Sequence, residues 1–230
     1  IGVANLKLFV AAALAGRLSR AVQSLHGYFH SEPQTLSRVG ALMLPLTSRL
    51  FARTVTVSDG LDAYARRRFR VSPRRTRRIY NPVVARGDEP VTSTELAARE
   101  PVVLAAGRFA AYKNFPGLVR AFARVTAPEA RLVLLGEGAD RPAIEAEVAR
   151  LGLAARVVLA GYQPEPWRYY RQARCFVSPA DSEAFGLVVV EALAFGLPVV
   201  ATRTEGPCEI LEQGRLGAVT PIRDEAALAN

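Results

Sequence analysis

From Pro101 onward, short apolar runs alternate with longer amphipathic segments, and no other feature constrains the fold of the chain as strongly. Runs of four or five apolar residues bounded by turn residues are typical of strands that are buried on both faces. We predict such strands over residues 102–106, 131–135, 157–160, 175–178 and 198–201. The segments after them predict helices over residues 115–125, 139–151, 165–172 and 186–195, and a short one around 208–213.

Continuous apolar strands that alternate with helices predict a parallel sheet with helices on both faces. This is the architecture of a doubly wound, Rossmann-like α/β domain. Ligands of such domains bind at the carboxyl ends of the strands. Candidate functional residues are therefore expected in the loops directly after strands.

Residues 1–84 show the same alternation less regularly. Helical patterns and strand-like runs follow one another over residues 4–18, 21–25, 36–53 and 54–57. Ser58-Asp59 then offers an N-cap for a helix that ends near Phe69. Residues 85–100 are polar and loop-like, so we place a linker there, between an N-terminal domain over 1–84 and a C-terminal domain over 101–230.

The chain is basic, with 30 Lys and Arg residues against 21 Asp and Glu residues and a formal net charge of +9. This balance favours acidic partners such as phosphates, anionic lipids or nucleic acid, without choosing among them. Eight arginines fall within Arg66–Arg78. Few aromatic residues accompany them, which argues against nucleic-acid binding. A solvated surface and a contact with anionic lipid headgroups both stay open for this segment.

Two cations follow the first strand of the C-terminal domain. Gly107 and Arg108 come directly after residues 102–106, and Lys113 lies just before the next helix. Two cations beside a helix N-terminus suit a diphosphate group. A solvated loop with ordinary basic residues is the alternative, although Lys113 is one of only two lysines in an arginine-dominated chain.

Two glutamates lie in the otherwise apolar stretch of residues 182–202. Glu183 is in the loop after the strand at 175–178, and Glu191 is on the second turn of the helix that begins near Gly186. An unpaired buried charge is costly, so these carboxylates should face a crevice, where they can accept hydrogen bonds from sugar or ribose hydroxyls. Glu183 could instead be a favourable charge at the helix N-terminus. An exposed position is a weak alternative for Glu191 because apolar residues surround it.

Glu183 and Glu191 form an E-x7-E motif. With further pieces in one strand–helix frame, the motif resembles the family 4 retaining glycosyltransferases, which are nucleotide-sugar enzymes with two facing Rossmann-like domains (the type-B, or GT-B, fold). The further pieces are Gly107-Arg108, Lys113-Asn114, Phe185-Gly186-Leu187 and the run Gly196–Ala201. The resemblance covers most of residues 102–211 and, less distinctly, residues 5–84.

The resemblance implies a GT-B fold that is truncated at both ends. The chain would begin inside the family's N-terminal, acceptor-side domain and end inside a helix of the C-terminal domain. The N-terminal domain would therefore be incomplete and the donor-binding domain nearly complete. Residues 204–211 depart from the Gly-Gly loop of many members and look like a variant from enzymes that build lipopolysaccharide or capsule glycans.

The resemblance also implies how the diphosphate is held. Arg108 and Lys113, with Gly107 beside them, would hold the donor diphosphate and stabilise it as a leaving group in place of a metal ion. No Asp-x-Asp pair occurs in the sequence, and neither Cys175 nor Cys208 has a neighbour at metal-ligand spacing. We therefore expect no metal and no cofactor, with the nucleotide-sugar as co-substrate.

Other matching positions would contact the rest of the donor. Glu191 would bind the ribose hydroxyls, Glu183 would touch the transferred sugar, and His26 would approach that sugar from the N-terminal domain. Backbone N–H groups near the sugar and phosphate would come from Phe185, Gly186 and Leu187. The base would be lined by Gly161, Tyr162 and Gln163.

The implied reaction is retaining transfer, in which the acceptor hydroxyl attacks from the face that the diphosphate leaves and no protein nucleophile is needed. We expect a UDP- or GDP-sugar as donor and a growing glycan or lipid-linked molecule as acceptor, in bacterial lipopolysaccharide, capsule or exopolysaccharide synthesis. The expected location is the cytoplasm, with peripheral contact between Arg66–Arg78 and the anionic inner face of the plasma membrane.

Two other classes of function stay open. Phosphorylases and nucleotide-sugar epimerases share this fold, and fold alone does not separate them from transferases. The E-x7-E motif with Arg108 and Lys113 favours the transferase. The other alternative is a non-enzymatic module that binds nucleic acid or anionic lipid through the arginine-rich segment.

Overall fold

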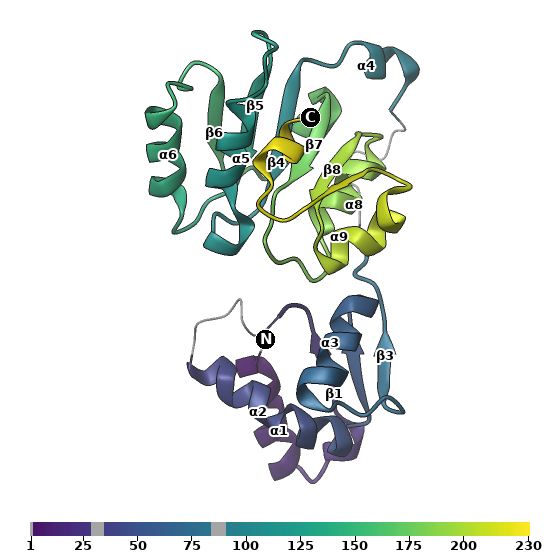
Figure 1. The fold of residues 1–230 in the computed structure, drawn as a ribbon. Helices are drawn as coiled ribbons and strands as arrows, with labels where there is room; N and C mark the ends of the chain where they lie inside the picture. Colours follow the sequence, from purple (N-terminus) through teal and green to yellow (C-terminus); the bar gives the residue numbers. More distant parts are fainter. Residues whose placement is uncertain (1, 29–34, 84–90) are drawn as a thin grey trace. The chain divides into compact units, whose positions relative to one another are not determined.

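The computed structural model describes residues 2–28, 35–83 and 91–230. Contacts between residues divide the chain into two units, one of residues 1–82 and 182–185 and the other of residues 83–181 and 186–230. Both units are α/β structures built on parallel sheets, which confirms the predicted fold class (Figure 1). None of the described helices is both long enough and apolar enough to cross a membrane.

The smaller unit contains a three-stranded parallel sheet in the order β1-β2-β3. Its strands are β1 (Val22–Leu25), β2 (Arg53–Thr56) and β3 (Thr76–Arg78). Its helices are α1 (Gly2–Leu14), α2 (Thr35–Leu50) and α3 (Asp59–Phe69). Ser58 caps α3 as predicted, because its hydroxyl accepts a hydrogen bond from the Leu61 N–H at 3.1 Å.

The arginine-rich segment runs from the end of α3 into β3. All eight arginines between residues 66 and 78 are exposed, while Phe69, Val71 and Thr76 are buried. The sequence predicts only a helix end and a loop here, whereas β3 pairs with β2 in parallel. The strand lies at an edge of the described sheet, where charged side chains are common and hide the strand pattern.

The larger unit contains a six-stranded parallel sheet in the order β6-β5-β4-β7-β8-β9. Its strands are β4 (Val102–Ala106), β5 (Arg131–Leu135), β6 (Val157–Gly161), β7 (Cys175–Ser178), β8 (Val199–Thr202) and β9 (Ala218–Thr220). Its α-helices are α4 (Ser93–Ala97), α5 (Phe115–Phe122), α6 (Arg141–Arg150), α7 (Trp167–Gln172), α8 (Leu187–Ala194), α9 (Glu205–Ile210) and α10 (Glu225–Ala229).

Helices cover both faces of this sheet (Figure 1). On one face, Phe115 of α5 and Ile144 of α6 belong to the same core as Leu134 of β5. On the other face, Tyr170 of α7 and Val189 of α8 belong to a second core with buried residues of β4, β7 and β8. The sheet is therefore doubly wound, as the alternation of strands and helices predicts.

Three elements of the larger unit differ from the sequence prediction. The helix α4 forms within the expected linker, where Thr92 and Glu95 make a capping box. The strand β9 was not predicted, and it pairs with β8 at the sheet edge. The helix α9 begins at Glu205 rather than near Cys208.

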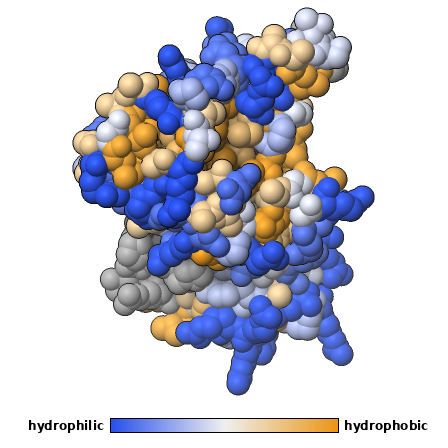
Figure 2. Space-filling model, turned by 45° about the horizontal axis from the view of Figure 1, so that its top comes forward, coloured by the Kyte–Doolittle hydropathy of each residue, from blue (hydrophilic) through white to orange (hydrophobic). Residues whose placement is uncertain are grey.

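Hydrophilic side chains cover much of the molecular face that Figure 2 shows, with hydrophobic residues gathered in smaller patches between them. In the larger unit, Tyr162 is 77% exposed and Leu187 is 42% exposed. Tyr162 comes directly after β6 and Leu187 opens α8. The exposed ring of Tyr162 thus lies just past the end of a strand, where ligands of this fold bind.

Candidate functional site

The larger unit has an open cavity of about 410 Å³ at the carboxyl ends of its strands. Ala106 and Leu135, which end β4 and β5, both line it. Parallel α/β sheets bind their ligands at this edge. The cavity is lined by Ala106, Gly107, Arg108, Leu135, Gly136, Glu137, Tyr162, Gln163, Pro166, Tyr170, Val188 and Glu191.

The loops after β4 and β5 touch through their backbones. The Gly107 N–H donates to the Leu135 carbonyl at 2.9 Å, and the Phe109 N–H donates to the Glu137 carbonyl at 2.9 Å. Gly136 has φ of 141°, and a Cβ atom there would lie only 1.8 Å from the Gly107 carbonyl oxygen. Only glycine permits this approach, so the two loops pack closely at the floor of the cavity, and one of them carries Arg108.

The two predicted cations both lie near Gly107. Arg108 is exposed and lines the cavity. Lys113 ends a short 3-10 helix over Ala111–Lys113, and its Cε would lie 4.0 Å from a Cβ atom placed on Gly107. Asn114 then caps α5, because its side-chain oxygen accepts from the Gly117 N–H at 3.2 Å. The cap fixes the turn that carries Lys113 beside the cavity.

Glu191 lies on α8 and is partly buried in the cavity wall. Its Oε2 accepts a hydrogen bond from the Tyr170 hydroxyl at 2.9 Å. Burial, with a further contribution from the negative charge of Glu191, raises the pKa of Tyr170, so the phenol keeps its proton and acts as the donor. The hydrogen-bond partner of the Glu191 carboxylate is thus a buried tyrosine, which the sequence does not predict.

The first glutamate of the motif, Glu183, belongs to the smaller unit. Glu183 lies in residues 182–185, which group with the smaller unit, and Phe185 of the same segment is buried against Tyr80 with ring centroids 5.8 Å apart. His26 also belongs to the smaller unit, directly after β1, where it is exposed and its Nε2 lies 3.1 Å from the Ser24 hydroxyl oxygen.

The structure therefore brings together part of the predicted set. Gly107, Arg108, Tyr162, Gln163 and Glu191 line one cavity. The backbone N–H of Gly136 donates to the carbonyl of Gly161 at 2.8 Å, which places Gly161 next to the cavity floor. Gly186 caps α8 with φ of 102° and Leu187 is its first residue.

Two polar lining residues, Glu137 and Tyr170, are not predicted from the sequence. Glu137 was open to prediction, because Gly136-Glu137-Gly138 follows β5 just as Gly107-Arg108 follows β4. Tyr170 had no such signal, since it lies inside a helix and looks like an ordinary core aromatic. Among the described residues, no group of three or more His, Cys, Asp or Glu side chains is placed to hold a metal ion.

Residues 90–230, more than half of the chain, match the model of the family described as Glycosyl transferases group 1. The chain belongs to the group 1 glycosyl transferases. This establishes the glycosyltransferase part of the resemblance seen in the sequence.

Curated relatives of this group 1 glycosyl transferase include the lipopolysaccharide core biosynthesis glycosyltransferase LpsE of Rhizobium meliloti. It is 36% identical over 132 residues, which are 57% of this chain and 38% of the relative. A Campylobacter jejuni N-acetylgalactosaminyltransferase that acts on a diphospho-undecaprenol substrate is 27% identical over 161 residues, which are 70% of this chain and 44% of that enzyme. The chain thus spans less than half the length of these two relatives.

Solved structures agree with the fold. The Anabaena protein HepE, in complex with UDP and glucose, superposes on 100% of this chain and 65% of its own, with a TM-score of 0.87 and 24% identity. Sucrose-phosphate synthase of Thermosynechococcus elongatus superposes on 98% of this chain and 61% of its own, with a TM-score of 0.83 and 27% identity. The group 1 glycosyl transferase therefore has the parallel α/β architecture of GT-B enzymes.

Proposed function

We propose that this group 1 glycosyl transferase is a retaining enzyme of the family 4 type that transfers a sugar from a UDP- or GDP-sugar. The observation that carries the proposal is the cavity at the strand ends, where Arg108 and Glu191 line one space. A cation and a carboxylate in one cavity match the two polar parts of a nucleotide diphosphate, its phosphates and its ribose. The neighbour HepE was solved with UDP and glucose, which favours the same donor class.

In this proposal the nucleotide lies across the ends of β4, β5 and β6. Glu191 accepts hydrogen bonds from the ribose hydroxyls. The exposed ring of Tyr162, with Gly161 and Gln163 beside it, lines the base. Stacking on an aromatic ring tolerates any base, so this contact suits both UDP and GDP.

The diphosphate lies against Gly107 in the same proposal, between Arg108 and Lys113. The acceptor oxygen forms a bond to the sugar C1 while the bond from C1 to the diphosphate oxygen breaks. The diphosphate leaves from the face that the acceptor attacks and takes up the acceptor proton. The two cations stabilise the charge that develops on the leaving group, in the role that a metal ion has in other enzymes.

Glu183, His26 and the N–H groups of Phe185, Gly186 and Leu187 stay predictions for the sugar side of the site. The acceptor proposed is a growing glycan or a lipid-linked molecule in bacterial lipopolysaccharide, capsule or exopolysaccharide synthesis. The names of the Rhizobium and Campylobacter relatives support this assignment.

The stereochemistry of the product tests the reaction. The chain would be incubated with UDP- or GDP-sugars labelled at C1, with EDTA present, and the first anomer released to acceptor or water would be followed by NMR. We expect the donor's own anomer, and a loss of rate of about 100-fold in Lys113→Ala, because one charge-stabilising donor is removed. Arg131→Ala, at the opposite edge of the sheet, is the control. Release of the inverted anomer, or activity that EDTA abolishes, would contradict the proposal.

We further propose that the enzyme works in the cytoplasm at the inner face of the plasma membrane, which it contacts through Arg66–Arg78. Eight exposed arginines on α3, on β3 and on the segment between them support this, since each arginine near an anionic surface contributes about 1 kcal/mol. Sedimentation with vesicles should show binding that requires phosphatidylserine. It should weaken strongly in the triple variant Arg67→Ser, Arg70→Ser, Arg74→Ser, and little in the control Arg124→Ser, Arg131→Ser, Arg203→Ser. Equal binding to neutral vesicles would exclude this contact.

A further inference from the structure

Tyr170 links the core of the larger unit to the cavity. Its side chain is 1% exposed, and its hydroxyl still reaches Glu191 Oε2 at 2.9 Å. The ring stacks on Phe195, with centroids 5.7 Å apart and planes 2° apart, and it also packs on Phe176. Close packing on two sides leaves the ring one position, so the hydroxyl is held at a fixed point in the cavity wall.

The phenol can only act as a donor to Glu191. The pKa of Tyr170 is raised by burial and by the carboxylate beside it, so deprotonation does not compete. A hydrogen bond to an ionised acceptor is stronger than one between neutral groups. Each carboxylate oxygen has two acceptor positions. Glu191 Oε2 can therefore keep its bond to Tyr170 while Glu191 still accepts from a ligand.

A buried arginine holds the end of α8, the helix that carries Glu191. Arg99 is 6% exposed, and its guanidinium donates to the carbonyls of Phe195 and Gly196 at the end of α8. These carbonyls have no partner within the helix, so Arg99 completes the element that carries Glu191. Phe195, on which Tyr170 stacks, is thus held through its backbone carbonyl as well as through its ring.

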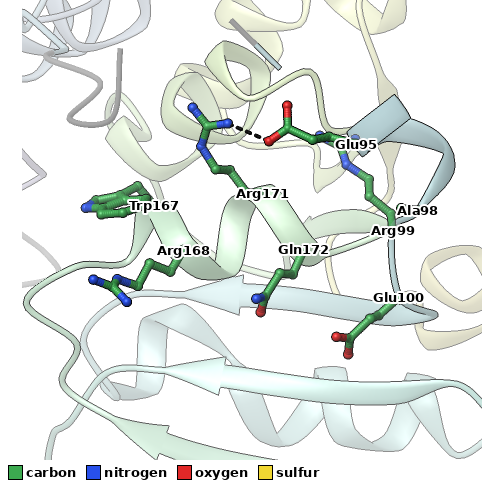
Figure 3. Close-up of a pocket in the computed structure, with 8 residues that line it drawn as sticks. All are labelled: Glu95, Ala98, Arg99, Glu100, Trp167, Arg168, Arg171 and Gln172. Carbon is green, nitrogen blue, oxygen red and sulfur yellow. Dashed lines mark hydrogen bonds and ion pairs between the residues drawn. The ribbon is translucent and has the colours of Figure 1, made fainter. Parts of the chain in front are cut away.

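Figure 3 shows a second cavity, of about 490 Å³, on a different face of α7. There Arg171, the neighbour of Tyr170, forms an ion pair with Glu95 of α4 at 2.8 Å. The Arg171 guanidinium also lies 5.8 Å from the centroid of the Phe195 ring. Phe195 therefore contacts both Tyr170 and Arg171. These contacts and the Arg171–Glu95 ion pair link α4, α7 and the end of α8.

We propose that Tyr170 is a positioning residue for donor recognition, which fixes the rotamer of Glu191 so that its carboxylate oxygens face the ribose hydroxyls of a nucleoside diphosphate. The inference rests on the proposed function, since it assigns Glu191 to the ribose. It adds a residue whose hydroxyl acts through another side chain. A preorganised carboxylate loses less rotamer freedom when the ligand binds, so the hydroxyl contributes to affinity without touching the nucleotide.

The test is calorimetric binding to the Tyr170→Phe variant, which keeps the ring and removes only the hydroxyl. The ligand is UDP or GDP, whichever the wild-type chain binds, together with its 2′,3′-dideoxy form. We expect Tyr170→Phe to weaken the ribonucleotide about tenfold and to leave the dideoxynucleotide unchanged, because only the ribose hydroxyls report the orientation of Glu191. Tyr169→Phe, the same change one position earlier on α7, should leave both affinities unchanged.

The outcomes separate the two proposals. If the wild-type chain binds a ribonucleotide and Glu191→Ala weakens it, but Tyr170→Phe binds normally, the positioning role is excluded and the donor site stands. An equal loss for the dideoxynucleotide means that Tyr170 has only a structural role, which also excludes the inference. Absence of nucleotide binding in the folded wild-type chain, or no effect of Glu191→Ala, overturns the donor site and the inference with it.

A second variant covers the case in which Tyr170→Phe does not fold because a partly buried carboxylate has lost its donor. In the Glu191→Ala background that carboxylate is gone. There, adding Tyr170→Phe should change the remaining ribonucleotide affinity less than twofold. A further loss of tenfold would show that Tyr170 acts independently of Glu191, and the inference would be wrong.

Discussion

The residues that shape the cavity include a glycine, and the effect of substituting it can be predicted from its geometry. Gly136 has a positive φ of 141°, and its missing side chain leaves room for the Gly107 carbonyl oxygen. That oxygen belongs to the loop that carries Arg108. A side chain at position 136 would therefore disturb the backbone of its own loop. It would also disturb the position of Arg108, the residue predicted to bind the phosphates.

Gly136→Ala is expected to destabilise the larger unit by about 2–4 kcal/mol, through backbone strain and a direct clash with backbone atoms. Gly152→Ala is a matched control, because Gly152 also has positive φ, of 67°, but a Cβ atom added there would meet no heavy atom within 4 Å. The control should cost about 1–2 kcal/mol. Urea unfolding of both variants measures the difference, and equal midpoints would show that the two loops can move apart.

At the scale of elements, the sequence predicts the strands of the larger unit well. The runs at 102–106, 131–135 and 175–178 coincide with β4, β5 and β7. These strands are covered on both faces, so burial makes most of their positions apolar and the pattern is plain. The sequence does not predict β3 and β9, because each has only three residues, too few for a strand pattern, and two of the three in β3 are arginines.

The residues of the candidate site also differ in whether the sequence predicts them. Arg108 and Glu191 could be predicted, because a charged residue next to a buried strand or inside an apolar helix stands out. Tyr170 could not, since its function depends on which helix packs against which. The pairing of α7 with α8 is a tertiary contact between residues 21 positions apart, and no local pattern encodes it.

At the scale of the whole molecule, one arrangement in the larger unit forms the candidate site. A doubly wound sheet brings the loops after β4, β5 and β6 to one edge, and α8 closes the space with Glu191. Because the chain belongs to the group 1 glycosyl transferases, this cavity is the candidate site for a sugar donor. We propose that this cavity holds the nucleotide of a sugar donor.

Calorimetric titration of the chain with UDP and GDP, without added metal, measures whether the cavity binds a nucleotide. We predict micromolar binding of one nucleotide, and a loss of about tenfold or more in Glu191→Ala, which removes the ribose ligand. Glu129→Ala, an exposed glutamate on a distant loop, should bind as the wild type does. Equal affinities of the two variants, or a folded wild-type chain that binds neither nucleotide, would exclude this cavity as the donor site.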